Sequence, residues 1–378
     1  MNKKKLVLPL LLASLIFTSC GTTKTSMDIK YNVDDYVTLT KNYKKLPVKV
    51  TGDYEFTDEK LQQYISQVIK SQAPYMKDTS KTQVASDSIV NVDYEGKKDG
   101  KAFDGGTAKG AVLNVATNSD AKGGTSFIEG FTAGLVGAKV GSTCEGKVTF
   151  PSDYQEKTLA GQEVTFTFTV NYICKEATID TIDDTYTNDN FKIKTVDEFK
   201  KQAKDQLKAS LESQKASDTR TAVIKEMTEK CKVKYPSNLV NARLKEFKTR
   251  FRSEYKIEKD QTLEEYVKKN LNMSYKDFEK QAKKNIKENL KTELIFEAVA
   301  KKENVEYDDK GFKEFVKSVK TNSGVSTNTE LYETYAPNAK AGKEYLKKMY
   351  VCTKAIDLCQ KGAKVTVEKA DTTTQATN

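Results

Sequence analysis

Hydrophobic and polar positions alternate along two stretches in the first half of the chain, as they do in strands that bury one face. At 88–96, Val90, Val92 and Tyr94 fall on one face and polar residues fall on the other. At 164–170 apolar residues alternate with threonines, and an Asp-Gly turn lies at 99–100. We therefore predict a small antiparallel sheet domain over residues 85–176.

After residue 176 the pattern changes to the helical period, with many Lys and Glu residues between the apolar positions. Capping boxes, in which Thr is followed three residues later by Glu, begin helices at Thr195 and Thr262. Further helices are predicted from Pro236 onward and over 274–304, 309–321 and 341–361. The predicted fold class is α+β, with the sheet domain inserted in or attached to an all-α domain over 177–368.

The stretch 47–84, which precedes the sheet, begins with a short strand and continues with a helix opened by Thr57. The apolar stripe of that helix consists of Leu61, Tyr64, Ile65, Val68 and Ile69. A stripe needs a partner, so we expect 47–84 to be a strand and helix arm that packs with the helical domain. Residues 21–46 are polar and lack a period, which predicts a flexible tether. The polar tail 369–378 is predicted to be disordered.

The first residues have the pattern of a bacterial lipoprotein signal. Three lysines at 3–5 precede an apolar run at 6–17, and small residues then lead to Cys20. We expect 1–20 to be a signal peptide with lipidation at Cys20, which would anchor the protein on the outer face of the cytoplasmic membrane. An ordinary signal peptide with an incidental cysteine is the alternative.

The net charge of +10, with charged residues at 31%, raises the question of nucleic acid as a partner. The excess of positive charge lies in the leader and in the lysine-rich second half, and no arginine cluster occurs. Lysines spaced along helices usually form a solvated face. We therefore predict no nucleic-acid partner, and an anionic membrane or wall surface is the alternative reading of the charge.

The chain contains no histidine, which excludes Ser-His-Asp triads, Cys-His pairs and His-ligated metals. None of the six cysteines has a C-x-x-C spacing, so no metal and no cofactor are predicted. Cys352 and Cys359 would lie about 10 Å apart on one helix, beyond disulfide reach. A bridge between Cys144 and Cys174 remains open.

Four short sequence motifs distinguish the sheet region: VDYEG at 92–96, KAFDGG at 101–106, FIEGF at 127–131 and VTFPSDY at 148–154. In this order they resemble the FK506-binding-protein (FKBP) type of peptidyl-prolyl isomerase, most closely the version carried by bacterial trigger factor. The resemblance implies an enzyme that rotates X-Pro bonds, whose barrier is about 18–20 kcal/mol. That chemistry needs a dry pocket for the proline ring and no nucleophile or general base.

The resemblance also implies roles for single residues. Phe131 would form the floor of the pocket, and Asp104 would face the substrate carbonyl. The walls would be Tyr94, Phe103, Phe127, Ile128 and Phe168, with Tyr154 near an expected aromatic position.

Each of these residues has a structural alternative. Tyr94, Phe103 and Phe168 would point inward in any small sheet domain, and Asp104 could simply hold a turn. Ala111 or a neighbour stands where soluble relatives place an aromatic residue on the strand after the Gly-Gly turn, and the segment 151–164 is short. The alternative function is therefore a catalytically idle, membrane-tethered holdase or peptide-binding module.

The helical half resembles the C-terminal chaperone domain of trigger factor in its helix order and in the phrase ELIFEAVA at 293–300. Phe247, Phe251 and Tyr255 would be either core residues or client contacts. The chain lacks the ribosome-binding loop of that family, so no ribosome partner is expected. The predicted function is a peptidyl-prolyl isomerase and folding chaperone for exported, unfolded or proline-containing polypeptides.

Overall fold

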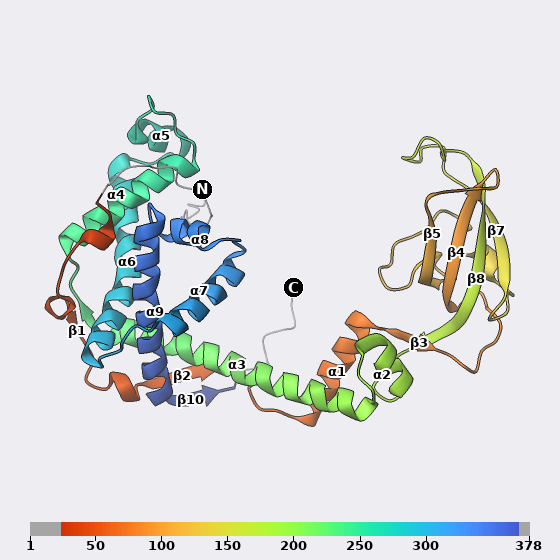
Figure 1. Cartoon of the computed structure of the whole chain (residues 1–378), viewed down its shortest axis with the longest axis horizontal. Helices are drawn as coiled ribbons and strands as arrows, with labels where there is room; N and C mark the ends of the chain where they lie inside the picture. The colour runs from red at the N-terminus through yellow and green to blue at the C-terminus, as the bar shows by residue number, and fades with distance from the viewer. Residues whose placement is uncertain (1–23, 370–378) are drawn as a thin grey trace, which may run out of the picture. The chain divides into compact units, whose positions relative to one another are not determined.

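The computed structural model describes residues 24–369, which fall into two compact units. One unit is Glu55–Glu212, and the other combines Met1–Tyr54 with Ser213–Asn378. We call them the sheet unit and the helical unit (Figure 1). The predicted signal peptide, Cys20 and residues 370–378 lie outside the described part of the chain.

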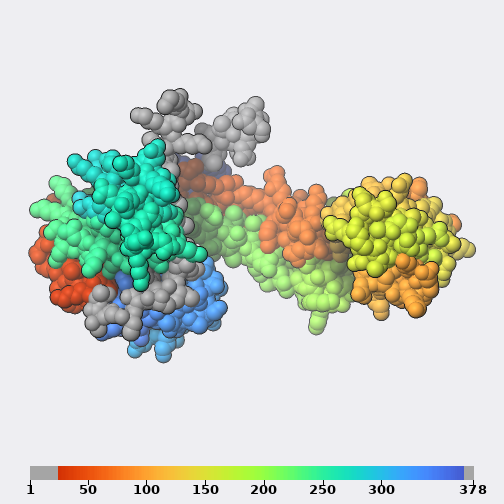
Figure 2. Space-filling view, turned by 90° about the horizontal axis from the view of Figure 1, so that it is seen from above, coloured from red at the N-terminus to blue at the C-terminus, as the bar shows by residue number. Residues whose placement is uncertain are grey.

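The sheet unit is built on one antiparallel sheet (Figure 1). Its strand order is β3-β8-β4-β5-β6, with β7 also paired to β8. The strands are β3 (Tyr75–Lys77), β4 (Ile89–Lys98), β5 (Lys101–Asn114), β6 (Ser119–Asp120), β7 (Thr143–Thr149) and β8 (Glu163–Glu176). In the space-filling view of Figure 2 they form one compact body in orange and yellow-green.

The buried face of this sheet follows the alternation seen in the sequence. Along β8, Val164, Phe166, Phe168 and Val170 are buried, whereas the threonines between them are partly exposed. The same core takes in Val90 and Val92 of β4, and Leu135 of the short helix η4 (Ala133–Leu135). Burial of one face fixes the register, since a slip of one residue would expose the whole apolar set.

Three helical segments complete the sheet unit: α1 (Asp58–Gln72), α2 (Asp184–Phe191) and the beginning of α3 (Val196–Lys230). Thr57 caps α1 through the N–H of Lys60. Ile65 and Ile69 pack in a separate small core with Tyr186 of α2 and Phe199 of α3. The predicted stripe of α1 thus has helical partners, although α2 itself was missed by the sequence analysis.

The helical unit contains the rest of α3 and six further helices within the described residues. They are α4 (Ser237–Glu254), α5 (Leu263–Asn270), α6 (Tyr275–Lys302), α7 (Asp309–Ser323), α8 (Asn328–Tyr335) and α9 (Ala339–Gly362). The main core is mostly aliphatic and includes residues of α6 and α9, with Leu294, Ile295 and Ala355 fully buried. The α+β prediction is confirmed, and α8 is an additional helix.

The prediction of a flexible tether over 21–46 is wrong for the described residues 24–46. This segment forms η1 (Ser26–Asp28), η2 (Val33–Asp35), β1 (Val37–Thr38) and η3 (Tyr43–Lys45). Val33, Val37, Tyr43 and Leu46 enter the main core of the helical unit. Their spacing matches neither a helix nor a strand, because these apolar side chains come from several short elements: η2, β1, and η3 with its C-cap Leu46.

Two small strand pairs also belong to the helical unit, which is therefore not purely α. β1 pairs antiparallel with β9 (Lys232–Val233). β2 (Pro47–Thr51) pairs in parallel with β10 (Lys364–Glu368). The predicted arm 47–84 is thus divided, because β2 lies in the helical unit and α1 in the sheet unit.

Between residues 24 and 369 no helix is both long and apolar enough to cross a membrane. All five described cysteines are free thiols, so the possible bridge between Cys144 and Cys174 is not formed.

Candidate functional site

The turn sequence around Asp104 forms a wide bulge between β4 and β5. Lys97 pairs with Ala102, and pairing resumes only at Glu95 with Thr107. Gly96 therefore stands alone opposite residues 103–106. Gly105 has φ +79°, a conformation that glycine adopts without strain. The bulge lifts Phe103 and Asp104 out of the regular ladder.

Gly96 is needed because the ring of Phe103 lies over the strand at this point. A Cβ added to Gly96 would lie 2.6 Å from the ring of Phe166 and 2.7 Å from that of Phe103. Gly106 is crowded in the same way, with its Cβ 2.7 Å from Phe103. Both glycines therefore make room for the ring of Phe103, and Gly96 also makes room for that of Phe166.

An aromatic cluster fills the space between the bulge and the buried face of the sheet. Phe131 is its centre, with ring centroids 5.2 Å from Tyr94, 4.7 Å from Phe166 and 5.2 Å from Phe168, all edge-to-face. The ring centroids of Phe103 and Phe166 are 5.9 Å apart, also edge-to-face. Edge-to-face packing is a preferred aromatic geometry, so this arrangement defines a rigid apolar surface.

The structure sorts the predicted wall residues by exposure. Tyr94, Phe103, Phe127 and Ile128 are partly exposed and can meet a ligand. Phe168 has no exposed surface, so it supports Phe131 from beneath and does not form a wall. This corrects the prediction for Phe168. Phe166, two residues earlier on the same face of β8, was missed although it contacts Tyr94, Phe103 and Phe131.

The floor is covered by its neighbour. The ring of Phe127 stacks on Phe131 at 4.6 Å with an interplanar angle of 26°, and Phe131 is only 3% exposed. A proline ring can therefore reach Phe131 only when Phe127 turns aside. Phe127 thus covers the floor in this structure, which refines its predicted role as a wall.

Asn118 holds the loop that carries Phe127, Ile128 and Phe131. Its Nδ2 donates to the carbonyl oxygens of Phe127 at 3.2 Å and Ile128 at 2.8 Å, and its Oδ1 accepts from Thr132 N at 3.0 Å. Asn118 also has φ +50°, a conformation that Asn tolerates better than most residues. Asn118 was not among the predicted site residues, and the turn-forming composition of 116–120 was its only signal in the sequence.

Two predicted residues lie at the rim. Asp104 is exposed, next to Phe103 on the bulge. Tyr154 is 37% exposed and its ring packs on Phe150 at 4.5 Å, so the short segment after Pro151 still supplies one aromatic residue. Ala111 pairs with Val92 and packs against the core, where it contributes only a methyl group.

Most side chains of the site are apolar. Burial, and after it the charge of Asp120, raises the pKa of Tyr94, so its phenol is neutral at physiological pH. In the part of the chain from 24 to 369, no group of three or more His, Cys, Asp or Glu side chains could hold a metal. The arrangement can therefore grip an apolar ring and orient an amide, but it offers no nucleophile.

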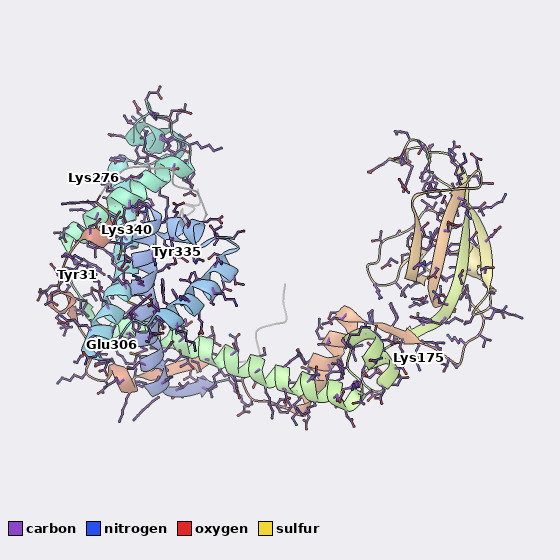
Figure 3. The ribbon with its side chains drawn as sticks, viewed as in Figure 1. Tyr31, Lys175, Lys276, Glu306, Tyr335 and Lys340 are labelled. Carbon is purple, nitrogen blue, oxygen red and sulfur yellow. The ribbon has the colours of Figure 1, made fainter. Side chains whose placement is uncertain are left out.

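A second candidate site is a groove of about 1670 Å³ in the helical unit. It is bordered by the N-terminal segment, the C-terminal end of α6, the connection between α6 and α7, and the N-terminal half of α9. Figure 3 labels Tyr31 in the N-terminal segment, Glu306 in the connection and Lys340 in α9. Its lining includes apolar side chains such as Val305 and Val351 together with several lysines. The partly apolar lining suits an extended, mixed polypeptide better than one small ligand.

The residues Phe247, Phe251 and Tyr255 do not line this groove. Phe251 is 5% exposed and packs on Phe278 in a small core with α5, so it is a core residue. Tyr255 is 40% exposed at the end of α4.

Comparison with known proteins matches both halves of the chain. Residues 80–174 match the FKBP-type peptidyl-prolyl cis-trans isomerase family, and residues 195–360 match the bacterial trigger factor C-terminus. Trigger factor 1 of Desulfitobacterium hafniense is 29% identical over 79% of this chain and 65% of its own length. The trigger factor of Acetivibrio thermocellus is 26% identical over 93% of this chain and 76% of its own length. That of Carboxydothermus hydrogenoformans is 32% identical over 58% of this chain.

The chain spans 65% of the first of these relatives and 49% of the third. A solved structure from work on substrate recognition by the trigger factor chaperone aligns with a TM-score of 0.47 at 17% identity, over 86% of this chain and 72% of that one. The chain thus combines a sheet region that matches the FKBP-type peptidyl-prolyl isomerase model with a helical region that matches the trigger factor C-terminus.

Proposed function

We propose that this protein is a peptidyl-prolyl isomerase and folding chaperone, anchored by lipid on Cys20 to the outer face of the cytoplasmic membrane. Its substrates are exported polypeptides that are unfolded and contain proline. The observation that carries the isomerase is the aromatic surface around Phe131, bordered by the bulge that bears Asp104. The relatives named above are trigger factors, which supports the chaperone role.

In this proposal, Phe127 turns away and the proline ring packs on Phe131, between Tyr94 and Phe103. The surface is apolar, so it disfavours the planar amide, whose resonance separates charge, relative to the twisted one. Asp104 lies at the rim, where the carbonyl that precedes the proline would lie. The catalytic effect comes from differential binding of the twisted amide.

The isomerase proposal is tested with a proline peptide assay on the full chain. Phe131→Leu and Asp104→Asn should each lower kcat/KM about tenfold, which corresponds to about 1.4 kcal/mol of barrier. Asp99→Asn is the matched control, because Asp99 is an exposed carboxylate on the same hairpin and its φ of +50° suits Asn. A wild-type rate equal to the uncatalysed rate would refute the enzyme, and equal loss in Asp99→Asn would misplace the site.

The anchor is tested by fractionation of cells. Cys20→Ala should move the protein from membranes to the soluble fraction and abolish incorporation of labelled fatty acid. Cys144→Ala, which removes a half-buried thiol of the sheet unit, should change neither. Retention of the Cys20→Ala variant on membranes would refute lipid anchoring.

The holdase alternative is favoured by one observation, the groove of the helical unit. Tyr307 and Tyr255 are matched, since both are exposed tyrosines (37% and 40%) but only Tyr307 lines the groove. Tyr307→Ser should weaken the suppression of client aggregation by the full chain, whereas Tyr255→Ser should not. If Asp104→Asn still suppresses aggregation, holding and isomerisation are separate activities.

A further inference from the structure

In the parallel pair of β2 and β10, the side chains of β10 are unusually exposed. Val365 pairs with Val48 and Val367 with Val50, so the four valines share one face of the pair. Val48 and Val50 are 2% and 4% exposed, but Val365 and Val367 are 36% and 41% exposed. Parallel strands are normally covered on both faces and continued by neighbours. β10 lacks that cover among the described residues.

The open edge of β10 presents a defined set of backbone groups. Lys364 N–H donates to Leu46 O, and Glu368 O accepts from Gly52 N–H. Backbone groups of alternate residues face the same neighbour in a parallel ladder, so Lys364, Thr366 and Glu368 are bonded toward β2. The N–H and C=O groups of Val365 and Val367 therefore face away from β2, and in residues 24–369 no other strand pairs with β10.

The sequence of β10 is complementary to itself. It reads Lys364-Val365-Thr366-Val367-Glu368, with opposite charges at its ends and Thr at its centre. When such a strand meets its own copy in antiparallel orientation, each lysine lies opposite a glutamate and each valine opposite a valine. We propose that β10 is a self-association edge that pairs antiparallel with β10 of a second copy of this chain, about a twofold axis at Thr366.

The hydrogen-bond alternation agrees with this register. Val365 of one copy and Val367 of the other would exchange both backbone hydrogen bonds, which are the outward-facing groups identified above. Thr366 would face its own copy as a non-hydrogen-bonded pair, and so would Lys364 and Glu368. Side chains lie closest in non-hydrogen-bonded pairs, so the charged residues would meet where their attraction is greatest. A register shifted by two residues would lose both charge pairs.

Glu368 already contacts a lysine within its own chain, since its Oε1 lies 2.7 Å from Lys49 Nζ. Both side chains are exposed, so this carboxylate can accept a second lysine from the other copy. The pairing would join two parallel pairs into one four-stranded sheet and shield the exposed valines. An exposed, unpaired edge of this kind is a template for another strand, and the symmetric charges select a copy of itself.

Cysteine cross-linking of the full chain, in a Cys20→Ala background, tests the register. Thr366→Cys should form a disulfide dimer on mild oxidation, because the two Cα atoms would be about 4.5–5.5 Å apart. Lys364→Cys and Glu368→Cys should not cross-link alone, because identical positions would be about 13 Å apart. Their mixture should cross-link at least tenfold more than either alone. Equal cross-linking of every variant, or none above the parent chain, would overturn the proposal.

Charge-reversal and proline substitutions in β10 test the proposed pairing without introducing thiols. Lys364→Glu and Glu368→Lys should each shift the monomer–dimer midpoint in sedimentation to at least tenfold higher concentration, and an equimolar mixture should restore it. Val367→Pro should abolish dimers while leaving the β2 ladder intact, because the lost N–H faces away from β2. Val367→Thr is the matched control. A wild-type chain that stays monomeric at several hundred micromolar, or binds only foreign extended peptides, would refute self-association.

Discussion

The apolar cluster beneath the candidate isomerase site and the α6–α9 region of the helical unit differ in whether they bury charge. The core beneath the candidate isomerase site consists of aliphatic and aromatic side chains, and Asp104 lies outside it at the exposed rim. The helical unit buries Glu293, whose Oε1 lies 2.8 Å from Lys348 Nζ and 3.5 Å from Arg243 Nη2. An isomerisation pocket gains from being dry, whereas a helix pair can bury charge if each charge meets its opposite.

Lys348 shows how the helical unit manages that charge. Burial by itself would lower the pKa of Lys348, but Glu293 and Glu297 beside it outweigh burial, and the net pKa is raised. A raised lysine pKa contributes stability that is fully present below the ordinary value near 10.4 and is lost only as pH rises through the raised value. Lys348 therefore stays charged across the neutral range.

The largest expected effect comes from breaking this cluster. Glu293→Gln should destabilise the helical unit by about 3–5 kcal/mol, because Lys348 and Arg243 lose a buried counter-charge. Denaturant unfolding followed by circular dichroism should show the helical transition moving to lower denaturant.

Glu288→Gln on the same helix is the control, since Glu288 is an exposed partner of Lys284 at 4.0 Å. It should change stability by less than about 0.5 kcal/mol. If Glu293→Gln also abolished isomerase activity, the two units would not be independent, and the comparison of their cores would fail.

A smaller effect is expected from crowding the aromatic site. Gly96→Ala would place a Cβ against Phe103 and Phe166, and overpacking of this kind costs about 1–3 kcal/mol. Since Phe103 must shift, isomerase activity should fall together with the stability of the sheet unit. Gly146→Ala is the control, because its Cβ would come no closer than 3.6 Å to any neighbour. Full activity in Gly96→Ala would show that Phe103 does not shape the site.

The smallest effect concerns an exposed cap in the helical unit. Asp308 accepts hydrogen bonds from Tyr350 Oη and Gly311 N, each at 2.6 Å, and these lower its pKa from 3.8 to about 2. A depressed carboxyl pKa contributes stability that is present above the ordinary value and is lost as pH falls through the depressed one.

Asp308→Asn should therefore lower the Tm of the helical unit by a few degrees at neutral pH and flatten its decline between about pH 4 and pH 2. Glu314→Gln is the control, because Glu314 is exposed on α7, the helix that Asp308 caps. It should leave the dependence of Tm on pH as in the wild type. If the Tm of the Asp308→Asn variant still fell steeply at acid pH, other carboxylates would be the cause of that fall.

Local sequence was sufficient for much of the fold and part of the site. Thr57 and Thr262 cap the helices they were predicted to open, because capping depends only on residues a turn away. The period-two pattern of β8 located its buried face. Among the predicted site residues, Tyr94, Phe103 and Phe131 meet in one cluster with Phe166. Phe166 and Phe168 share a face and a residue type, so periodicity could not tell a wall from a support.

The sequence by itself thus determined the sheet, most of the helices and the change of period near residue 176. Only the tertiary structure decided which stretches the helical core recruits. Residues 24–46 lack a period because isolated side chains such as Val33 and Leu46 enter a core built by distant helices. β10 pairs with β2 across more than three hundred residues, and the buried Glu293 meets Lys348 of another helix. Such contacts have no local signal, since their free energy arises between segments that are far apart along the chain.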